Sequence, residues 1–122
     1  MLVMPISATI SNDTDDTATR FWVRDPRAKC LDGSQAGYYY KPGAPGNKTA
    51  VFFLEGGGLC SHEEDCKARA NTDLGSSKNW GPSIDLGSIL SSNASYNPTF
   101  YQAHKVNGKY IGAKNHAFIL PQ

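Results

Sequence analysis

The stretch "AVFFLEGGGLC", residues 50–60, passes from a continuous apolar run to a glutamate and three glycines. The apolar run, which begins at Thr49 and ends at Leu54, is typical of a strand that is buried on both faces of a sheet. The glycines Gly56, Gly57 and Gly58 carry no Cβ, so they can adopt positive φ and let a substrate approach the main chain closely. The sequence therefore predicts a buried strand that ends in a turn of exposed backbone.

Such a turn suits one kind of chemistry in particular. Two main-chain N–H groups can stabilise the oxyanion of an acyl-transfer intermediate, an effect worth roughly 3 kcal/mol per donor. The His-Gly-Gly-Gly turn of lipases and esterases acts in this way. The alternative is a flexible turn where strand and helix pack closely, and the glycine triplet by itself favours that alternative. A phosphate-binding loop is disfavoured because no Gly-Lys-Ser/Thr follows.

A short helix is predicted directly after the glycines. Ser61 and Glu64 match the pattern of a capping box, and "HEEDCKARA" (62–70) places acidic residues first and basic residues near the end. Upstream, "CLDGSQAGYYYKPG" (30–43) predicts a β-hairpin with its turn around residues 32–34. Downstream, "TFYQAHKV" (99–106) starts a further strand. Strand, glycine-rich turn, helix and later strand indicate an α/β layer, although one such unit leaves the sheet incomplete.

The remaining segments carry weaker patterns. Residues 1–20 are polar and without a period, which predicts a frayed extension. "RFWVRD" (20–25) is a candidate strand, and "GAPGNK" (43–48) is a turn. Residues 71–98 are mostly loop, with a helical turn expected near Ile89.

Length and charge narrow the classes of function. The chain has 122 residues and a mass of 13.2 kDa, enough for one domain with a modest core. Its net charge of +1 gives no basic patch of the kind that binds nucleic acid. No apolar run reaches the roughly 18 to 20 residues that span a bilayer. The start "MLVMPISATI" lacks the basic and apolar regions of a convincing signal peptide.

Three cysteines, Cys30, Cys60 and Cys66, leave the redox state open. A disulfide between Cys60 and Cys66 is expected if the protein is exported, and two free thiols if it is cytosolic. A metal site is the rival interpretation, but it needs more ligands than His62 supplies, and the spacing is unusual for zinc. N-glycosylation sequons at Asn12, Asn47 and Asn93 lean towards a secretory history.

The usual catalytic groups are not recognisable. The histidines His62, His104 and His116 are candidate bases, but a structural role is the simpler reading for each. No serine lies in a Gly-x-Ser-x-Gly motif, so a Ser-His-Asp triad cannot be assembled from these residues.

Several ordered motifs resemble one family. They are "CLDGSQAGYYYKPG", "VFFLEGGGLCSHEEDCKAR", "TDLGSSKNW", "ILSSNASYNPTFY" and "HKV", which together cover roughly residues 30–106. In this order and spacing they are similar to the pectin acetylesterase/Notum family of serine esterases. The resemblance implies the N-terminal part of an α/β-hydrolase-like fold over residues 21–106, followed by a divergent tail at 107–122.

The resemblance also implies site residues. Gly57 and Gly58 match the glycines whose N–H groups form the oxyanion hole, and Cys60 and Cys66 match a family disulfide. Leu59 departs from the tryptophan that plant-type members usually have at this position in the lining of the acyl pocket. The family's nucleophile, acid and histidine have no counterpart in this sequence.

We therefore expect a carboxylic-ester hydrolase that deacetylates a pectin-like polysaccharide, with negligible activity from this chain alone. The resemblance implies no cofactor or metal, no nucleic-acid partner and a secreted or cell-wall location. One alternative is a non-catalytic glycan-binding remnant. Its candidate stacking aromatics are Tyr38, Tyr39, Tyr40, Trp80, Tyr96 and Tyr101. Another is a truncated product without a stable fold, since an isolated αβ unit would expose strand edges.

Overall fold

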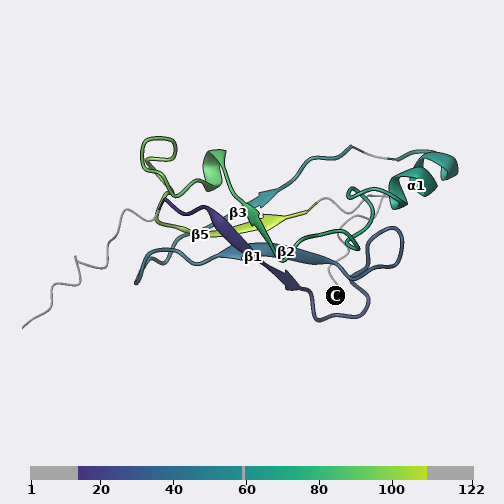
Figure 1. Cartoon of the computed structure of the whole chain (residues 1–122), viewed down its shortest axis with the longest axis horizontal. Helices are drawn as coiled ribbons and strands as arrows, with labels where there is room; N and C mark the ends of the chain where they lie inside the picture. Colours follow the sequence, from purple (N-terminus) through teal and green to yellow (C-terminus); the bar gives the residue numbers. More distant parts are fainter. Residues whose placement is uncertain (1–13, 59, 110–122) are drawn as a thin grey trace, which may run out of the picture.

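The described part of the chain forms a five-stranded mixed sheet with one short α-helix beside it (Figure 1). The computed structural model describes residues 14–58 and 60–109. In chain order the elements are β1 Thr17–Trp22, β2 Gly37–Lys41, β3 Ala50–Leu54, α1 Glu63–Ala70, β4 Ser83–Asp85, the 3-10 helix η2 Ser88–Leu90 and β5 His104–Gly108. The strand order is β3-β5-β2-β1-β4. The α/β prediction is confirmed, with a sheet that remains open.

Among the described strands only β3 and β5 run parallel, and their register places the glycine turn. Ala50 pairs with His104 and Leu54 with Gly108, so the carboxyl ends of both strands lie at the same end of the sheet. The chain passes through α1, β4 and η2 before it returns to β5, which gives the long crossover that a parallel connection requires. The other neighbours in the sheet pair antiparallel.

The predicted hairpin is present, and polar groups hold its turn. Lys29 and Gln35 form a bridge across the turn, and Gly33 has φ 85°. The Asp32 Oδ1 atom accepts a hydrogen bond from the Ser34 N–H group at 2.9 Å. Burial alone would raise the pKa of the Asp32 carboxyl, but hydrogen bonds from Ser34 and Ser76 hold that pKa below its usual range. The charged carboxylate therefore stabilises this turn.

The hairpin partner, β1, begins earlier than predicted. The strand starts at Thr17, whereas the sequence predicts it from Arg20, and Ala18 is fully buried. Residues 17–20 are therefore strand and not frayed extension; the cause is pairing with both β2 and β4, which short-range patterns do not show. Similarly, β5 continues to Gly108, into the segment predicted as a divergent tail. Residues 1–13 and 110–122 lie outside the described residues.

The strand β3 corrects a central expectation. Phe52 is 71% exposed, Leu54 62% and Phe53 42%, so the strand is not buried on both faces. Within the described part of the chain β3 pairs only with β5, at the edge of the sheet. No residue of α1 is buried, and Figure 1 shows this helix at one end of the molecule, away from the faces of the sheet. In the described part of the chain the apolar run is therefore largely exposed, and Val51 is its one member that packs against the core.

The helix forms where the sequence predicts it, but with a different start. Its N-cap is His62 and not Ser61, and no side chain caps its first turn. The Ser61 hydroxyl instead lies 2.9 Å from His62 Nδ1, so the predicted capping box is wrong. The charge pattern is confirmed, with acidic residues in the first turn and basic ones in the last.

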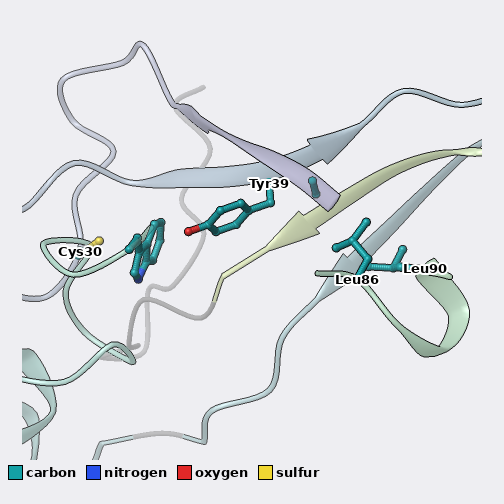
Figure 2. Packing of buried hydrophobic residues seen from close by; sticks show 6 residues of the cluster. Cys30, Tyr39, Leu86 and Leu90 are labelled. Carbon is teal, nitrogen blue, oxygen red and sulfur yellow. The ribbon is translucent and has the colours of Figure 1, made fainter. Parts of the chain in front are cut away.

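The core lies where β1 and β2 meet the loop that follows α1. Its buried members are Ala18, Cys30, Tyr39, Trp80, Leu86 and Leu90. Figure 2 shows Tyr39 in the middle of this cluster, with Cys30 on one side and Leu86 and Leu90 on the other. The Tyr39 hydroxyl donates to the Gly81 carbonyl at 2.8 Å, and burial raises the pKa of this phenol. The helical turn expected near Ile89 is confirmed as η2, whereas β4 was not predicted.

Candidate oxyanion site

The glycine turn leaves the sheet at the carboxyl end of β3. The Glu55 N–H group donates to the Gly108 carbonyl at 2.9 Å, so the ladder with β5 continues one residue beyond the strand. Gly58 then adopts φ 71°, a left-handed conformation that favours glycine. A Cβ atom built at Gly56 would contact nothing within 4 Å, so space does not require glycine there. The predicted positive φ is therefore found at one position of the triplet, Gly58.

A cation from α1 holds the turn from one side. The Arg69 Nη1 atom donates to the Gly57 carbonyl at 2.6 Å and to the Gly58 carbonyl at 2.7 Å. In a trans peptide the N–H group points opposite to the carbonyl of the same unit. The N–H group of Gly58, which shares its peptide unit with the Gly57 carbonyl, is therefore directed away from Arg69. Sequence reasoning missed Arg69, because its only signal was a basic residue in the last helical turn.

A disulfide holds the same helix to the same turn. Cys60 and Cys66 are bonded, with their Cα atoms 5.2 Å apart, and Cys30 is a free, buried thiol. The structure thus contains the disulfide that the sequence left open against two free thiols. Among the described residues, no group of three or more His, Cys, Asp or Glu side chains is arranged to hold a metal ion.

Polar side chains from the carboxyl ends of β3 and β5, and from the residue that follows each strand, meet beside the turn. The Glu55 Oε1 atom accepts hydrogen bonds from Asn107 Nδ2 at 3.0 Å and from Lys109 Nζ at 3.1 Å. Asn107 is 5% exposed, and its Oδ1 atom has no hydrogen-bond partner in the described part of the chain. These three side chains line a cavity of about 370 Å³, together with Phe53 and residues 84–90. Asn107 and Lys109 were missed because they fall in the predicted tail.

Neither described histidine is placed as a base for this site. His104 begins β5, four residues before Gly108, which is about 13 Å along the strand. Its Nδ1 atom lies 2.8 Å from the Tyr40 hydroxyl and 3.1 Å from the Gly43 N–H group, and its Nε2 atom lies 2.9 Å from the Asn47 carbonyl. His62 is a surface side chain paired with Asp65. The structural reading therefore fits both, and His116 lies outside the described residues.

The aromatic residues do not all offer sugar-stacking faces. Tyr39 and Trp80 are buried in the core, 1% and 6% exposed, which removes them as stacking faces. Tyr38 is stacked on Phe21 with ring centroids 5.8 Å apart, whereas Tyr96 is 79% exposed. The glycan-binding alternative thus loses two of its candidates.

The sequons at Asn47 and Asn93 lie in turns. The Oδ1 atom of each asparagine accepts a hydrogen bond from the N–H group two residues later, at 2.8 Å in both cases. Both residues are partly exposed, and neither belongs to a strand or helix.

No helix among the described residues is long and apolar enough to cross a membrane.

Comparisons with known proteins show the family. The family model "Pectinacetylesterase" matches residues 12–117. Pectin acetylesterase 4 of Arabidopsis thaliana is 42% identical over 84 residues, which are 68% of this chain and 20% of that protein. Palmitoleoyl-protein carboxylesterase NOTUM of Schmidtea mediterranea is 42% identical over 86 residues, 68% of this chain and 16% of that protein.

A solved structure supports the fold. The Wnt deacylase Notum from Drosophila superimposes with a TM-score of 0.73 at 31% identity, over 78% of this chain and 27% of that one. The sheet is therefore part of an α/β-hydrolase-like fold. The chain spans about a fifth of the length of the curated relatives that it matches. Fold, glycine turn and disulfide thus accompany a family match over most of the sequence, and the chain belongs to the pectinacetylesterase family.

Proposed function

We propose that this chain supplies the oxyanion-binding part of a carboxylic-ester hydrolase of the pectin acetylesterase type. The observation that carries the proposal is the glycine turn at the end of β3, with Gly58 at φ 71° and its peptide oriented by Arg69. In the complete site a serine attacks the acetyl carbonyl while a histidine accepts the serine proton. The N–H groups of Gly57 and Gly58 stabilise the oxyanion, the sugar alcohol leaves, and water releases acetate.

The nucleophile must come from residues other than these 122, since the sequence holds no Gly-x-Ser-x-Gly motif. The outer edge of β3 offers the place for the missing strand, because β3 pairs only with β5 in the described part and four of its five residues are exposed. A strand added there would end near the glycine turn if it ran parallel. The chain alone is expected to have negligible esterase activity.

A graft tests the proposal. Residues 21–106 of this chain, the predicted domain segment, replace the matching region of Arabidopsis pectin acetylesterase 4, and hydrolysis of p-nitrophenyl acetate is measured. We add residues 17–20 and 107–108 to the graft, because β1 and β5 include them. A folded graft with saturable, serine-inhibitor-sensitive turnover supports the proposal, and a folded but inactive graft contradicts it. If this recipient does not fold, NOTUM of Schmidtea mediterranea serves as the second recipient.

Within this proposal the substrate is an acetylated, pectin-like polysaccharide. The support is the name of the matching family and of the plant relatives, whereas the Notum relatives are named as palmitoleoyl-protein esterases. Acetate release from acetylated pectin, compared with release of a long acyl chain from a palmitoleoyl peptide, separates the two. Preference for the palmitoleoyl peptide would contradict the polysaccharide assignment.

We further propose that the protein is secreted or lies in the cell wall. The Cys60–Cys66 disulfide supports this, because such bonds persist in oxidising compartments. Asn47 and Asn93 would then carry glycans. Expression through a secretory pathway should give a protein whose electrophoretic mobility changes after glycosidase treatment, and Asn47→Gln with Asn93→Gln should remove most of that change. Mobility unaffected by the enzyme would argue against glycosylation.

A further inference from the structure

We propose that Arg69 is a positioning residue of the oxyanion turn, one that fixes which way the Gly57–Gly58 peptide points. Both carbonyl contacts come from the same atom, Arg69 Nη1, at 2.6 and 2.7 Å. Hydrogen bonds from a charged donor are roughly twice as strong as neutral ones. This inference rests on the proposed function for its catalytic meaning, but its structural part can be measured independently.

The orientation matters because of the chemistry that the turn has to perform. If the Gly57–Gly58 peptide flipped, its carbonyl oxygen would take the place of the N–H group and would repel a negatively charged intermediate instead of stabilising it. Glycine makes such a flip easy, since it crosses between negative and positive φ at little cost. By binding both carbonyl oxygens on the helix side, Arg69 stabilises the arrangement in which the Gly58 N–H group faces the other way.

The helix that carries Arg69 is itself held by few contacts. No residue of α1 is buried, so core packing does not place it. Cys66 and Arg69 are three residues apart and therefore lie on one face of the helix, towards the turn. Near the C-terminal end of the helix, the loop at Gly75 passes close to its last turn. A Cβ atom on Gly75 would lie 2.5 Å from the Arg69 carbonyl oxygen, so only glycine permits this close approach. The disulfide fixes the distance between helix and turn, and Arg69 fixes the direction of the peptide.

The structural part is tested on the 122-residue chain by NMR relaxation of the glycine amides. With Arg69 intact, we expect order parameters near 0.85 for Gly57 and Gly58, and below about 0.6 in Arg69→Ala. Arg69→Lys keeps the charge without the rigid fork and should recover part of the order. Lys67→Ala is the matched control, because Lys67 lies on the same helix, is 73% exposed and pairs with Glu63. Unchanged glycine order parameters in Arg69→Ala would overturn the proposal.

The catalytic part is tested in the active graft. We expect Arg69→Ala to lower kcat by about 10- to 100-fold, the effect of a misplaced site group, with KM within about twofold. Arg69→Lys should restore part of kcat, and Lys67→Ala should leave both constants unchanged. The positioning role of Arg69 would be refuted if the Arg69→Ala graft had a normal kcat, or if its kcat fell only in proportion to the fraction of folded protein. Either result would leave the esterase proposal intact. A folded graft without activity would contradict the esterase proposal instead, while the relaxation experiment still decides how Arg69 acts.

Discussion

Replacement of Phe52 with threonine measures how much free energy the apolar side chains of β3 contribute to the stability of this chain. Threonine keeps a high strand propensity, so the substitution mainly removes apolar contact. Phe52 is 71% exposed, which leaves about three-tenths of the residue buried. Because a fully buried phenylalanine costs about 3–5 kcal/mol when truncated, the expected loss in the free energy of unfolding is about 1 kcal/mol.

The assay is urea unfolding of the 122-residue chain, followed by circular dichroism. With an m-value of about 1 kcal/mol/M, the midpoint should fall by about 1 M for Phe52→Thr. Leu90→Ala is the comparison, because Leu90 is 3% exposed in the core and its truncation should cost about 2–5 kcal/mol. A Phe52→Thr loss as large as that of Leu90→Ala would refute the exposed edge. The absence of a cooperative transition in the unmodified chain would instead favour the truncated product without a stable fold.

The same substitution should behave differently in the graft. There the remainder of the esterase is expected to pair with the edge of β3 and to cover its faces. Phe52→Thr should then cost about 3 kcal/mol or more, as for a core phenylalanine. Equal losses in the chain and in the graft would show that β3 stays exposed in both, and would contradict the place proposed for the missing strand.

Four further results are expected. The unfolded, unreduced chain should show a single reactive thiol, that of Cys30, and replacing Cys60 and Cys66 with serine should lower stability by about 2 kcal/mol in thermal unfolding. Tyr39→Phe should cost about 1 kcal/mol in the same assay, because the hydrogen bond from the buried Tyr39 hydroxyl to the Gly81 carbonyl is lost. The pKa of Asp32 is lowered in the folded state, so its contribution to stability is complete above the unfolded pKa of about 3.9 and is lost as pH falls below that value. Asp32→Asn should weaken this pH dependence of the urea midpoint; an unchanged dependence would contradict the assignment.

What the sequence predicts well is local. The hairpin turn at 32–34, the helix after the glycines and the helical turn near Ile89 all depend on neighbouring residues, and each is present. What it misses is set by long-range pairing. The start of β1 at Thr17 depends on β2 and β4, and β4 itself is a short strand without a pattern of its own.

The apolar run of β3 shows why burial cannot be read from one segment. An apolar sequence such as "AVFFL" indicates that the strand is suited to a buried environment. The exposure of its side chains, however, depends on which neighbouring strands and helices are present. In this structure those neighbours are absent from the described residues, and Phe52 and Leu54 are exposed as a result. The mismatch between an apolar strand and an exposed edge is thus itself an argument that β3 is built for a larger sheet.

The glycine turn was predicted for a reason that proved incomplete. The lack of Cβ atoms explains why the backbone can be approached, and Gly58 uses that freedom at φ 71°. Freedom alone would also allow the peptide to flip, so a working turn needs a group that removes one of the two orientations. Arg69 and Cys66 lie on the same face of α1. Arg69 fixes the direction of the Gly57–Gly58 peptide, and the Cys60–Cys66 disulfide fixes the distance between the helix and the turn. The helix is therefore best understood as the support of the turn, since it buries no residue of its own and contributes little else to the fold.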